Sequence, residues 1–177
     1  MRELLKISSF LLLSFLLLSC GEEEKKPRTR PYTTEEVKEA SKQMGQWDSQ
    51  RQKDEIEMYI KNHGWEMKET GTGLYYMYMK NGAGEAAKDH DQVFVSYKVF
   101  LLSGTLCYSS ETDGPRVVRI GSDYVESGLH EALKMMKVGD QLRVILPSHL
   151  AHGLTGDDDK IPPRSSVLYE IELLEKK

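Results

Sequence analysis

The sequence has little cysteine and no excess of basic residues, and each shortage excludes a class of protein. Cys20 and Cys107 are its two cysteines among 177 residues, which is too few for a scaffold held by disulfides. Lysine and arginine number 24 against 28 acidic residues, giving a net charge of -4. That balance offers nothing to neutralise the phosphates of a nucleic acid. Aromatic residues are also scarce, at 8%. What remains is a globular domain of ordinary size, alone or with an appendage.

The first 20 residues have the pattern of an export signal. Arg2 and Lys6 give a short positive start, and residues 7–19 are uncharged and mostly apolar. As a helix this run would be roughly 20 Å long, at about 1.5 Å per residue. The hydrocarbon core of a membrane is about 30 Å thick. The length therefore favours a secretory signal peptide, and an uncleaved signal anchor stays open as the alternative.

The end of this signal, Leu17-Leu18-Ser19-Cys20, resembles a bacterial lipobox. In that class of signal the cysteine thiol receives a diacylglycerol, and cleavage then makes the cysteine the first residue. Several acyl chains anchor a protein stably where a single chain is marginal. The resemblance implies that residues 1–19 are a lipoprotein signal peptide and that Cys20 is lipidated. The protein would then be lipid-anchored in the bacterial cell envelope, on the periplasmic face or the cell surface.

Residues 20–32 are predicted to be a tether that follows the lipidated cysteine. The segment carries three glutamates, four basic residues and two prolines, so it is too polar to bury and stiffened by proline. An acidic run at this place resembles signals that send some lipoproteins to the outer cell surface. A plain solvated spacer explains the run equally well.

Residues 33–71 are predicted to form a helical extension. Thr33 and Glu36 have the spacing of a capping box, and apolar residues recur at helical intervals after them. The stretch 48–55 is wholly polar, which predicts two helices or one bent helix. We expect the tryptophan and tyrosine side chains of this extension to pack in a core, with a partner surface as the alternative.

From Leu74 onward the apolar period changes to two, which is typical of strands. The expected strands are residues 74–79, 92–101, 106–109, 116–120, 141–146 and 167–174. Between the fourth and fifth of these, Leu129, Ala132, Leu133 and Met136 have the spacing of one helix face. The pattern predicts an α+β fold in which a curved antiparallel sheet of about five to six strands wraps around one central helix.

Residues 72–177 resemble the FK506-binding-protein (FKBP) type of peptidyl-prolyl cis-trans isomerase in an ordered set of blocks. The blocks are Val95-Ser96-Tyr97, Leu101-Leu102-Ser103-Gly104, Tyr108-Ser109-Ser110, Val125-Glu126-Ser127-Gly128-Leu129, Ala151-His152-Gly153, Ile161-Pro162-Pro163 and the run from Val167 to Leu174. Each block is weak alone, but their order and spacing fit throughout. The resemblance implies an FKBP-like fold and an isomerase, without a cofactor, that assists the folding of exported proline-containing polypeptides. Within the family the blocks are most similar to gliding-motility-associated bacterial lipoproteins, which implies clients in the gliding machinery.

Rotation of an X–Pro bond needs no nucleophile, metal or proton donor. Its barrier of about 18–20 kcal/mol comes from amide resonance, and the uncatalysed reaction takes tens to hundreds of seconds. Because the planar amide is more polar than the twisted one, an apolar and water-poor pocket favours twisting. The expected site is therefore a pocket of aromatic and aliphatic side chains.

The resemblance gives catalytic roles to Tyr97, His152 and Tyr169. It implies a substrate pocket formed by Cys107, Tyr108, Arg116, Val125, Glu126, Leu129 and Ile161. Several of these depart from the family. Leu129 replaces a floor tryptophan, His152 a tyrosine and Tyr108 an aspartate. Cys107 and Arg116 replace phenylalanines, and Glu126 replaces an isoleucine whose backbone N–H serves as the ligand donor. These departures leave open a second hypothesis, a chaperone or binding module with an eroded isomerase pocket.

The sequence gives only a weak candidate for a metal site. His149 and His152 lie near the acidic run 157–159, but no third ligand has a diagnostic spacing. We expect no metal, and we expect the acidic run to be a solvated turn. Cys107 is expected to be a buried, inert thiol. The oligomeric state stays open.

Overall fold

The computed structural model describes residues 31–177, and the predicted signal peptide, Cys20 and most of the tether lie outside the described residues. The chain divides into two units, residues 1–39 and 40–177, each described by itself. The elements are α2 (Thr34–His63), β1 (Lys68–Glu69), β2 (Tyr75–Lys80), β3 (Gln92–Leu101), β4 (Leu106–Ser109), α3 (Ser110–Asp113), β5 (Arg116–Arg119), α4 (Ser127–Lys134), β6 (Gln141–Leu146), the 3-10 helix η2 (Ser148–Leu150) and β7 (Val167–Lys176). Among these elements no helix is long and apolar enough to span a membrane.

Helix α2 begins at the predicted capping box. The backbone N–H of Thr33 donates to Oε2 of Glu36 at 2.9 Å, and the N–H of Glu36 donates to Oγ1 of Thr33 at 3.3 Å. These reciprocal bonds satisfy backbone donors that a helix start otherwise leaves without partners. The predicted start of the helix is therefore confirmed.

Of the two predicted forms, two helices or one bent helix, the first is wrong, because α2 runs unbroken from Thr34 to His63. Within the polar stretch that suggested a break, side chains three or four residues apart form ion pairs and a hydrogen bond. Arg51 contacts Asp48 at 2.8 Å and Glu55 at 3.8 Å, and Gln50 donates to Asp54 at 2.7 Å. Such pairs stabilise a helix surface by a few tenths of a kcal/mol each, about 0.2–0.5. A polar run thus continues the helix here instead of ending it.

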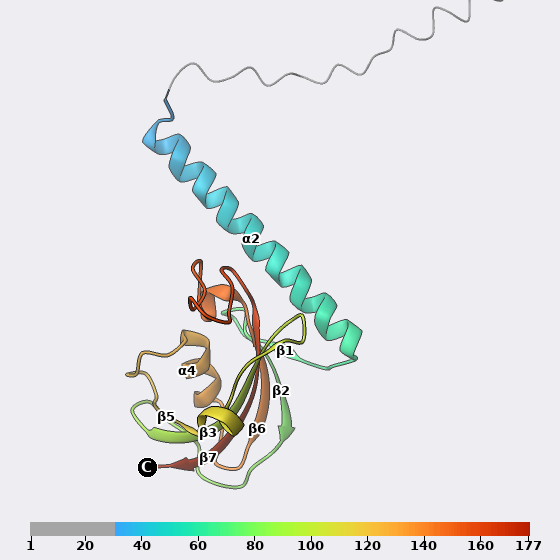
Figure 1. The fold of residues 1–177 in the computed structure, drawn as a ribbon, viewed down its shortest axis with the longest axis vertical. Coiled ribbons are helices and arrows are strands. Elements are labelled where there is room, and N and C mark those ends of the chain that lie inside the picture. The colour runs from blue at the N-terminus through green and yellow to red at the C-terminus, as the bar shows by residue number, and fades with distance from the viewer. Residues whose placement is uncertain (1–30) are drawn as a thin grey trace, which may run out of the picture. The chain divides into compact units, whose positions relative to one another are not determined.

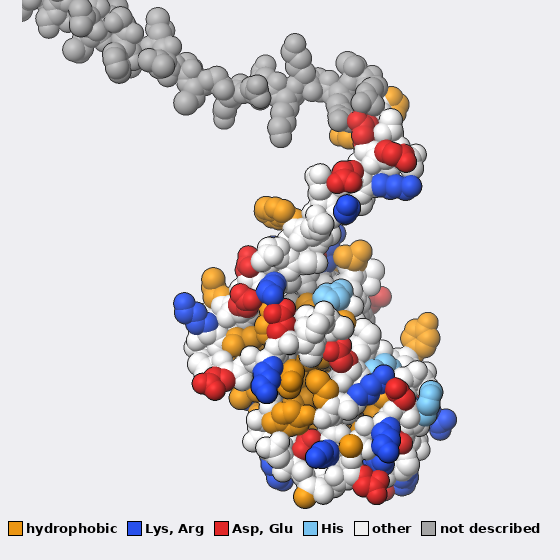
Figure 2. Space-filling view, turned by 180° about the vertical axis from the view of Figure 1, so that it is seen from behind, with side chains coloured by type: hydrophobic (Ala, Val, Ile, Leu, Met, Phe, Trp, Pro, Cys, Tyr) orange, Lys and Arg blue, Asp and Glu red, His pale blue; other side chains and the backbone are white. Residues whose placement is uncertain are grey.

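The two halves of α2 meet different surroundings within the second unit. Met44 and Trp47 are 61% and 79% exposed, so the expectation that this stripe packs in a core is wrong for the first half. Figure 2 shows isolated hydrophobic side chains, not a continuous patch, on the exposed part of the helix. Ile56 is fully buried, and Tyr59 and Ile60 pack beside it. Core packing is therefore confirmed for the second half.

A buried glutamine holds α2 against the loops at one end of the sheet. Gln52 is 3% exposed, and its Oε1 accepts the backbone N–H of Ser148 at 2.8 Å. Its Nε2 donates to Asp48 at 3.0 Å. Buried polar groups need such partners, so this amide fixes where the helix lies on the domain.

The sheet has seven strands, all antiparallel, in the order β1-β2-β6-β7-β3-β4, and β5 pairs with β3. The predicted α+β fold with a curled antiparallel sheet and an N-terminal helix is confirmed. The sheet has one strand more than expected, since β1 is only two residues long and pairs with β2. A strand of two residues is too short to be recognised from an alternating pattern of apolar side chains.

The alternation of side chains divides the sheet into two faces. On the inner face Val144, Leu146 and Tyr169 pack with Leu133 of α4 in the main core. On the outer face Ile145 and neighbouring residues pack with Ile56 of α2. Figure 1 shows α4 on one side of the strands and the C-terminal half of α2 on the other. The sheet curls around α4, and the start of this helix lies at the inner face of the sheet.

Candidate active site

A cavity of about 270 Å³ opens on the inner face of the sheet, beside the start of α4. Its lining comes from β3, β4, β5, β7, the residue before α4 and the loop between η2 and β7. The lining residues are Tyr97, Val99, Tyr108, Arg116, Glu126, His152, Asp157 and Tyr169. Chain segments more than 70 residues apart in the sequence therefore meet at one hollow.

One wall of the cavity is aromatic and aliphatic. Tyr97 and Val99 are alternate residues of β3, so they face the same side of the sheet. Tyr169 of β7 pairs with Val99 across the two strands and is 3% exposed. Burial raises the pKa of Tyr169 well above its ordinary value, and the adjacent Glu126 carboxylate adds to the rise. This wall offers rigid neutral rings that a proline ring can pack against.

The rest of the lining is largely charged, and this charged wall differs from the apolar pocket expected from the chemistry. Glu126 is central to it, with a side chain only 7% exposed. Its Oε1 accepts a hydrogen bond from the Tyr169 hydroxyl at 2.9 Å and lies 3.0 Å from Nε2 of His152. Its Oε2 lies 3.9 Å from the Arg116 guanidinium. The residue before α4 thus places a carboxylate in the cavity.

The backbone around α4 explains why Glu126 faces the cavity. Glu126 is the residue before the helix, yet its side chain makes no capping hydrogen bond. Two residues later, a Cβ on Gly128 would meet Leu146 at 2.6 Å and the carbonyl of Leu150 at 2.9 Å. Only glycine permits that approach. The start of α4 is therefore pressed onto the end of β6 and η2, beside the loop that carries His152.

Asp157 organises the loop that closes the cavity. Its Oδ1 accepts the backbone N–H groups of Ile161 at 2.8 Å and Asp159 at 3.0 Å, and its Oδ2 accepts the hydroxyl of Tyr108. Burial acts to raise the pKa of Asp157, but the hydrogen bonds outweigh it and hold that pKa below its ordinary value. The same bond, with burial, raises the pKa of Tyr108. The acidic run therefore includes a structural carboxylate and is not merely a solvated turn.

The resemblance placed Tyr108 at the position of an aspartate of the family, and in this structure its hydroxyl contacts a carboxylate from another element. Asp157 comes from the loop before β7 and meets the Tyr108 hydroxyl from β4. Sequence reasoning missed Asp157 and Val99 as lining residues. For Val99, its place two residues after Tyr97 on one strand was the available signal.

The structure places the predicted site residues in three groups. Tyr97, Tyr108, Arg116, Glu126, His152 and Tyr169 line the cavity. Cys107, Leu129 and Ile161 are 4%, 2% and 2% exposed and belong to the main core. Val125 borders a neighbouring hollow that shares Glu126 and His152 with the cavity. Leu129 thus lies in the core and does not line the cavity, although the resemblance placed it at the family's floor tryptophan.

The candidate metal ligands point to different partners. Nε2 of His149 lies 3.1 Å from the carbonyl of Thr72, and His152 faces Glu126. Within residues 31–177 no three His, Cys, Asp or Glu side chains are grouped as metal ligands.

Burial raises the pKa of the Cys107 thiol, and its sulfur contacts backbone carbonyls.

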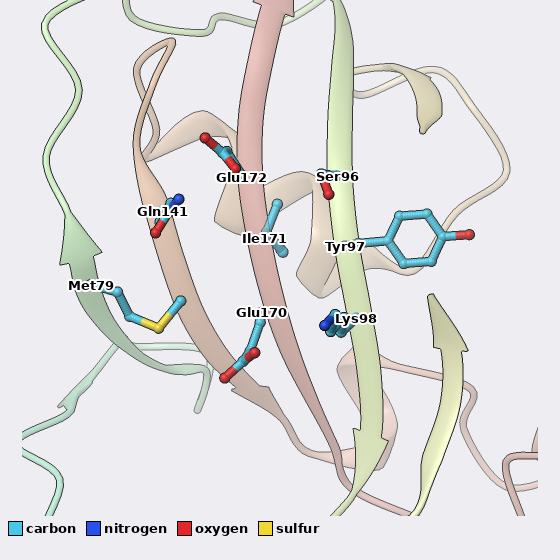
Figure 3. A pocket seen from close by; sticks show the side chains of 8 residues that line it. All are labelled: Met79, Ser96, Tyr97, Lys98, Gln141, Glu170, Ile171 and Glu172. Carbon is cyan, nitrogen blue, oxygen red and sulfur yellow. The ribbon is translucent and has the colours of Figure 1, made fainter. Parts of the chain in front are cut away.

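A second hollow, of about 220 Å³, lies on the outer face of the sheet. Figure 3 shows Met79, Gln141, Glu170 and Glu172 around it, while the ring of Tyr97 points away. Two of its charged groups are already paired, Lys98 with Glu111 at 2.7 Å and Glu170 with Arg143. The inner cavity is therefore the better candidate for a functional site.

The fold is that of a known class of protein. A family model described as FKBP-type peptidyl-prolyl cis-trans isomerase matches residues 83–174, more than half of the chain. The chain belongs to this family.

Individual relatives agree with this membership. FkpA of Escherichia coli strain K12, described as an FKBP-type peptidyl-prolyl cis-trans isomerase, is 38% identical over 122 residues, covering 68% of this chain and 43% of FkpA. FKBP11 of Bos taurus is 36% identical over 90 residues, covering 51% of this chain and 44% of FKBP11. The chain thus spans less than half the length of these relatives.

Solved structures give the same result. The crystal structure of FkpA from Escherichia coli superposes with a TM-score of 0.64 at 31% identity, covering 82% of this chain and 74% of that one. The crystal structure of AtFKBP13 gives a TM-score of 0.60 at 27% identity, covering 63% of this chain and 99% of that one. The likeness to FkpA extends over more of the chain than the isomerase family model does.

Proposed function

We propose that the protein catalyses the cis-trans isomerisation of X–Pro bonds in polypeptides, and that the inner cavity is the site. The observation that carries the proposal is the wall formed by Tyr97, Val99 and Tyr169 within a domain of the FKBP family. The wall holds the proline ring and excludes water from one side of the peptide bond. Desolvation disfavours the planar amide, whose resonance creates the barrier.

A backbone donor next to this wall completes the proposed site. Glu126 precedes the first turn of α4, and N–H groups at a helix start have no intrahelical acceptor. The N–H of Glu126 therefore fits a flanking carbonyl of the substrate and holds it while the X–Pro bond turns. The side chain of His152 adds a polar group on the same side of the cavity.

A refolding assay limited by proline isomerisation tests the proposal. The wild-type protein should accelerate the slow refolding phase. Tyr97→Ala should reduce that acceleration at least about tenfold, because an aromatic contact worth more than about 1.4 kcal/mol is lost. Ile161→Ala should weaken it by loosening the loop behind the cavity. Tyr32→Ala, at a residue that is not part of the cavity lining, is the matched control and should keep full activity. No acceleration by the wild-type protein would contradict the proposal.

A binding module without catalysis is the second candidate. The observation in its favour is the charged wall, where Arg116 and Glu126 replace apolar residues of the family. Such a module would bind proline-containing peptides and leave the refolding rate unchanged. Peptide binding measured beside the refolding assay separates the two candidates.

We further propose that residues 33–71 are an extension of an isomerase domain at 72–177, and that the protein is anchored in the cell envelope by a lipid on Cys20. The lipobox-like sequence and the apolar run before it support the anchor. The likeness of the sequence blocks to gliding-motility lipoproteins supports clients in the gliding machinery. Mass spectrometry of the mature N-terminus should find Cys20 acylated, with Cys20→Ser unacylated as the control. An unmodified Cys20 on an intact signal would favour the signal-anchor alternative.

A further inference from the structure

We propose that Glu126 makes this cavity select proline segments that carry a cationic side chain next to the proline. The inference rests on the proposed function, because it takes the cavity to be the site that holds the proline. It concerns the side chain of Glu126, whereas the family's ligand contact at this position is a backbone N–H.

The first observation is an acceptor oxygen without a donor. Oε1 of Glu126 has the Tyr169 hydroxyl at 2.9 Å and His152 at 3.0 Å. Oε2 is buried, and no group within residues 31–177 donates a hydrogen bond to it. The Arg116 guanidinium is 3.9 Å away, which is beyond hydrogen-bond distance. A buried carboxylate oxygen left in this way carries a desolvation cost that a bound donor would relieve.

The second observation is the charge balance of the lining. Two carboxylates, Glu126 and Asp157, face the cavity with one permanent cation, Arg116. Both oxygens of Asp157 are already occupied by Tyr108, Asp159 and Ile161. The acceptor left for a further donor is therefore Oε2 of Glu126, which Arg116 faces across 3.9 Å without donating a hydrogen bond.

The chemistry of proline decides where the donor comes from. Proline has no backbone N–H, so the residue held in the cavity offers nothing to Oε2. A neighbouring residue must supply the donor, and a charged donor satisfies a buried carboxylate better than a neutral one. A lysine ammonium carries three donors on a flexible apolar stem, and that stem suits the aromatic wall next to Glu126.

A peptide series tests this selection. Matched proline peptides carry lysine, norleucine or glutamate immediately before or after the proline. Norleucine keeps the stem of lysine without its charge. Binding is measured by fluorescence anisotropy and isomerisation by its rate, for the wild-type protein, Glu126→Gln and Glu175→Gln. Glu126→Gln keeps the shape of the side chain, and Glu175→Gln makes the same charge change at an exposed residue outside the cavity lining.

The expected result is a preference of about tenfold for lysine over norleucine in the wild-type protein, the range of a charge-assisted hydrogen bond. The preference should vanish in Glu126→Gln and persist in Glu175→Gln. Equal binding of lysine and norleucine peptides by the wild-type protein would overturn the inference, as would a preference that survives Glu126→Gln. Lysine-selective binding without acceleration would support the inference and refute the proposed catalysis. Binding of none of the peptides would overturn both.

Discussion

The two faces of the sheet bury their apolar surface in different ways. The inner face packs on α4 through side chains that are almost all apolar, such as Leu133 and Val144. The outer face packs on the second half of α2 through a smaller cluster around Ile56, and a buried amide, Gln52, sits at its edge. The inner face therefore supplies most of the folding free energy, and the outer face depends more on one polar anchor.

The comparison also explains where the functional cavity lies. Its apolar wall is a continuation of the inner core, because Tyr169 belongs to both. In its charged wall Glu126 stands at the helix start and Asp157 on a loop, both outside the regular sheet, and Arg116 is the first residue of β5. The sheet thus carries one wall, and the other stands mostly on a helix start and a loop.

The largest expected effect is on the inner face. Leu133→Ala removes a fully buried side chain and should lower the free energy of unfolding by about 2–5 kcal/mol, since a cavity is left behind. Leu174→Ala is the matched control, because this leucine is 42% exposed on β7, and it should change stability by at most about 0.5 kcal/mol. Urea denaturation measures both. Similar losses for the two variants would refute the assignment of the inner core.

The outer face gives the next effect. Gln52→Ala leaves the buried N–H of Ser148 without its acceptor, so it should cost about 1–3 kcal/mol. Hydrogen exchange at Ser148 should accelerate as well. Gln50→Ala removes only an exposed bond to Asp54 and should cost a few tenths of a kcal/mol, about 0.2–0.5. Equal costs for both glutamines would show that α2 is not held through Gln52.

The regular part of the fold could be predicted from the sequence because its signals are local. Alternating apolar residues predicted β3, β4 and β6 at the observed bounds, and the stripe through Leu129 and Leu133 predicted α4. Apolar spacing indicates which face of a helix or strand can be buried, but it does not show whether another element packs on that face. This is why Met44 and Ile56 looked alike in sequence and differ in burial.

The charged wall of the cavity could not be predicted, since it is made by contacts distant in sequence. Glu126 and Tyr169 are 43 residues apart, and Tyr108 and Asp157 are 49 apart. No spacing rule connects such pairs. Family resemblance named most of the lining residues but assigned no role to the Glu126 side chain or to Asp157. The roles of those two carboxylates are therefore the part of the site that most needs experimental tests.

A smaller, pH-dependent effect is expected at Asp157. Because its pKa is held below the ordinary 3.8, this carboxylate contributes stability above that pH and loses it as the pH falls through the depressed pKa. Asp157→Asn should lower the free energy of unfolding by about 1 kcal/mol at pH 7, and the difference from wild type should disappear under acid conditions. Asp158→Asn, exposed and at φ 62° where asparagine is tolerated, is the control. A difference that persists unchanged to low pH would contradict the assignment.

The smallest effect is expected from the exposed half of α2, and the two tryptophans form the matched pair. Trp47→Ala should change the free energy of unfolding by at most about 0.5 kcal/mol, because its side chain is 79% exposed. Trp65→Ala should cost about 1–2 kcal/mol, since this ring lies 4.1 Å from the Arg143 guanidinium and packs edge-on against Tyr59. Intrinsic fluorescence separates them: the emission shift on unfolding should survive in Trp47→Ala and largely vanish in Trp65→Ala. Comparable losses of stability would mean that Trp47 is covered in solution, and the contrast between the two halves of the helix would then fail.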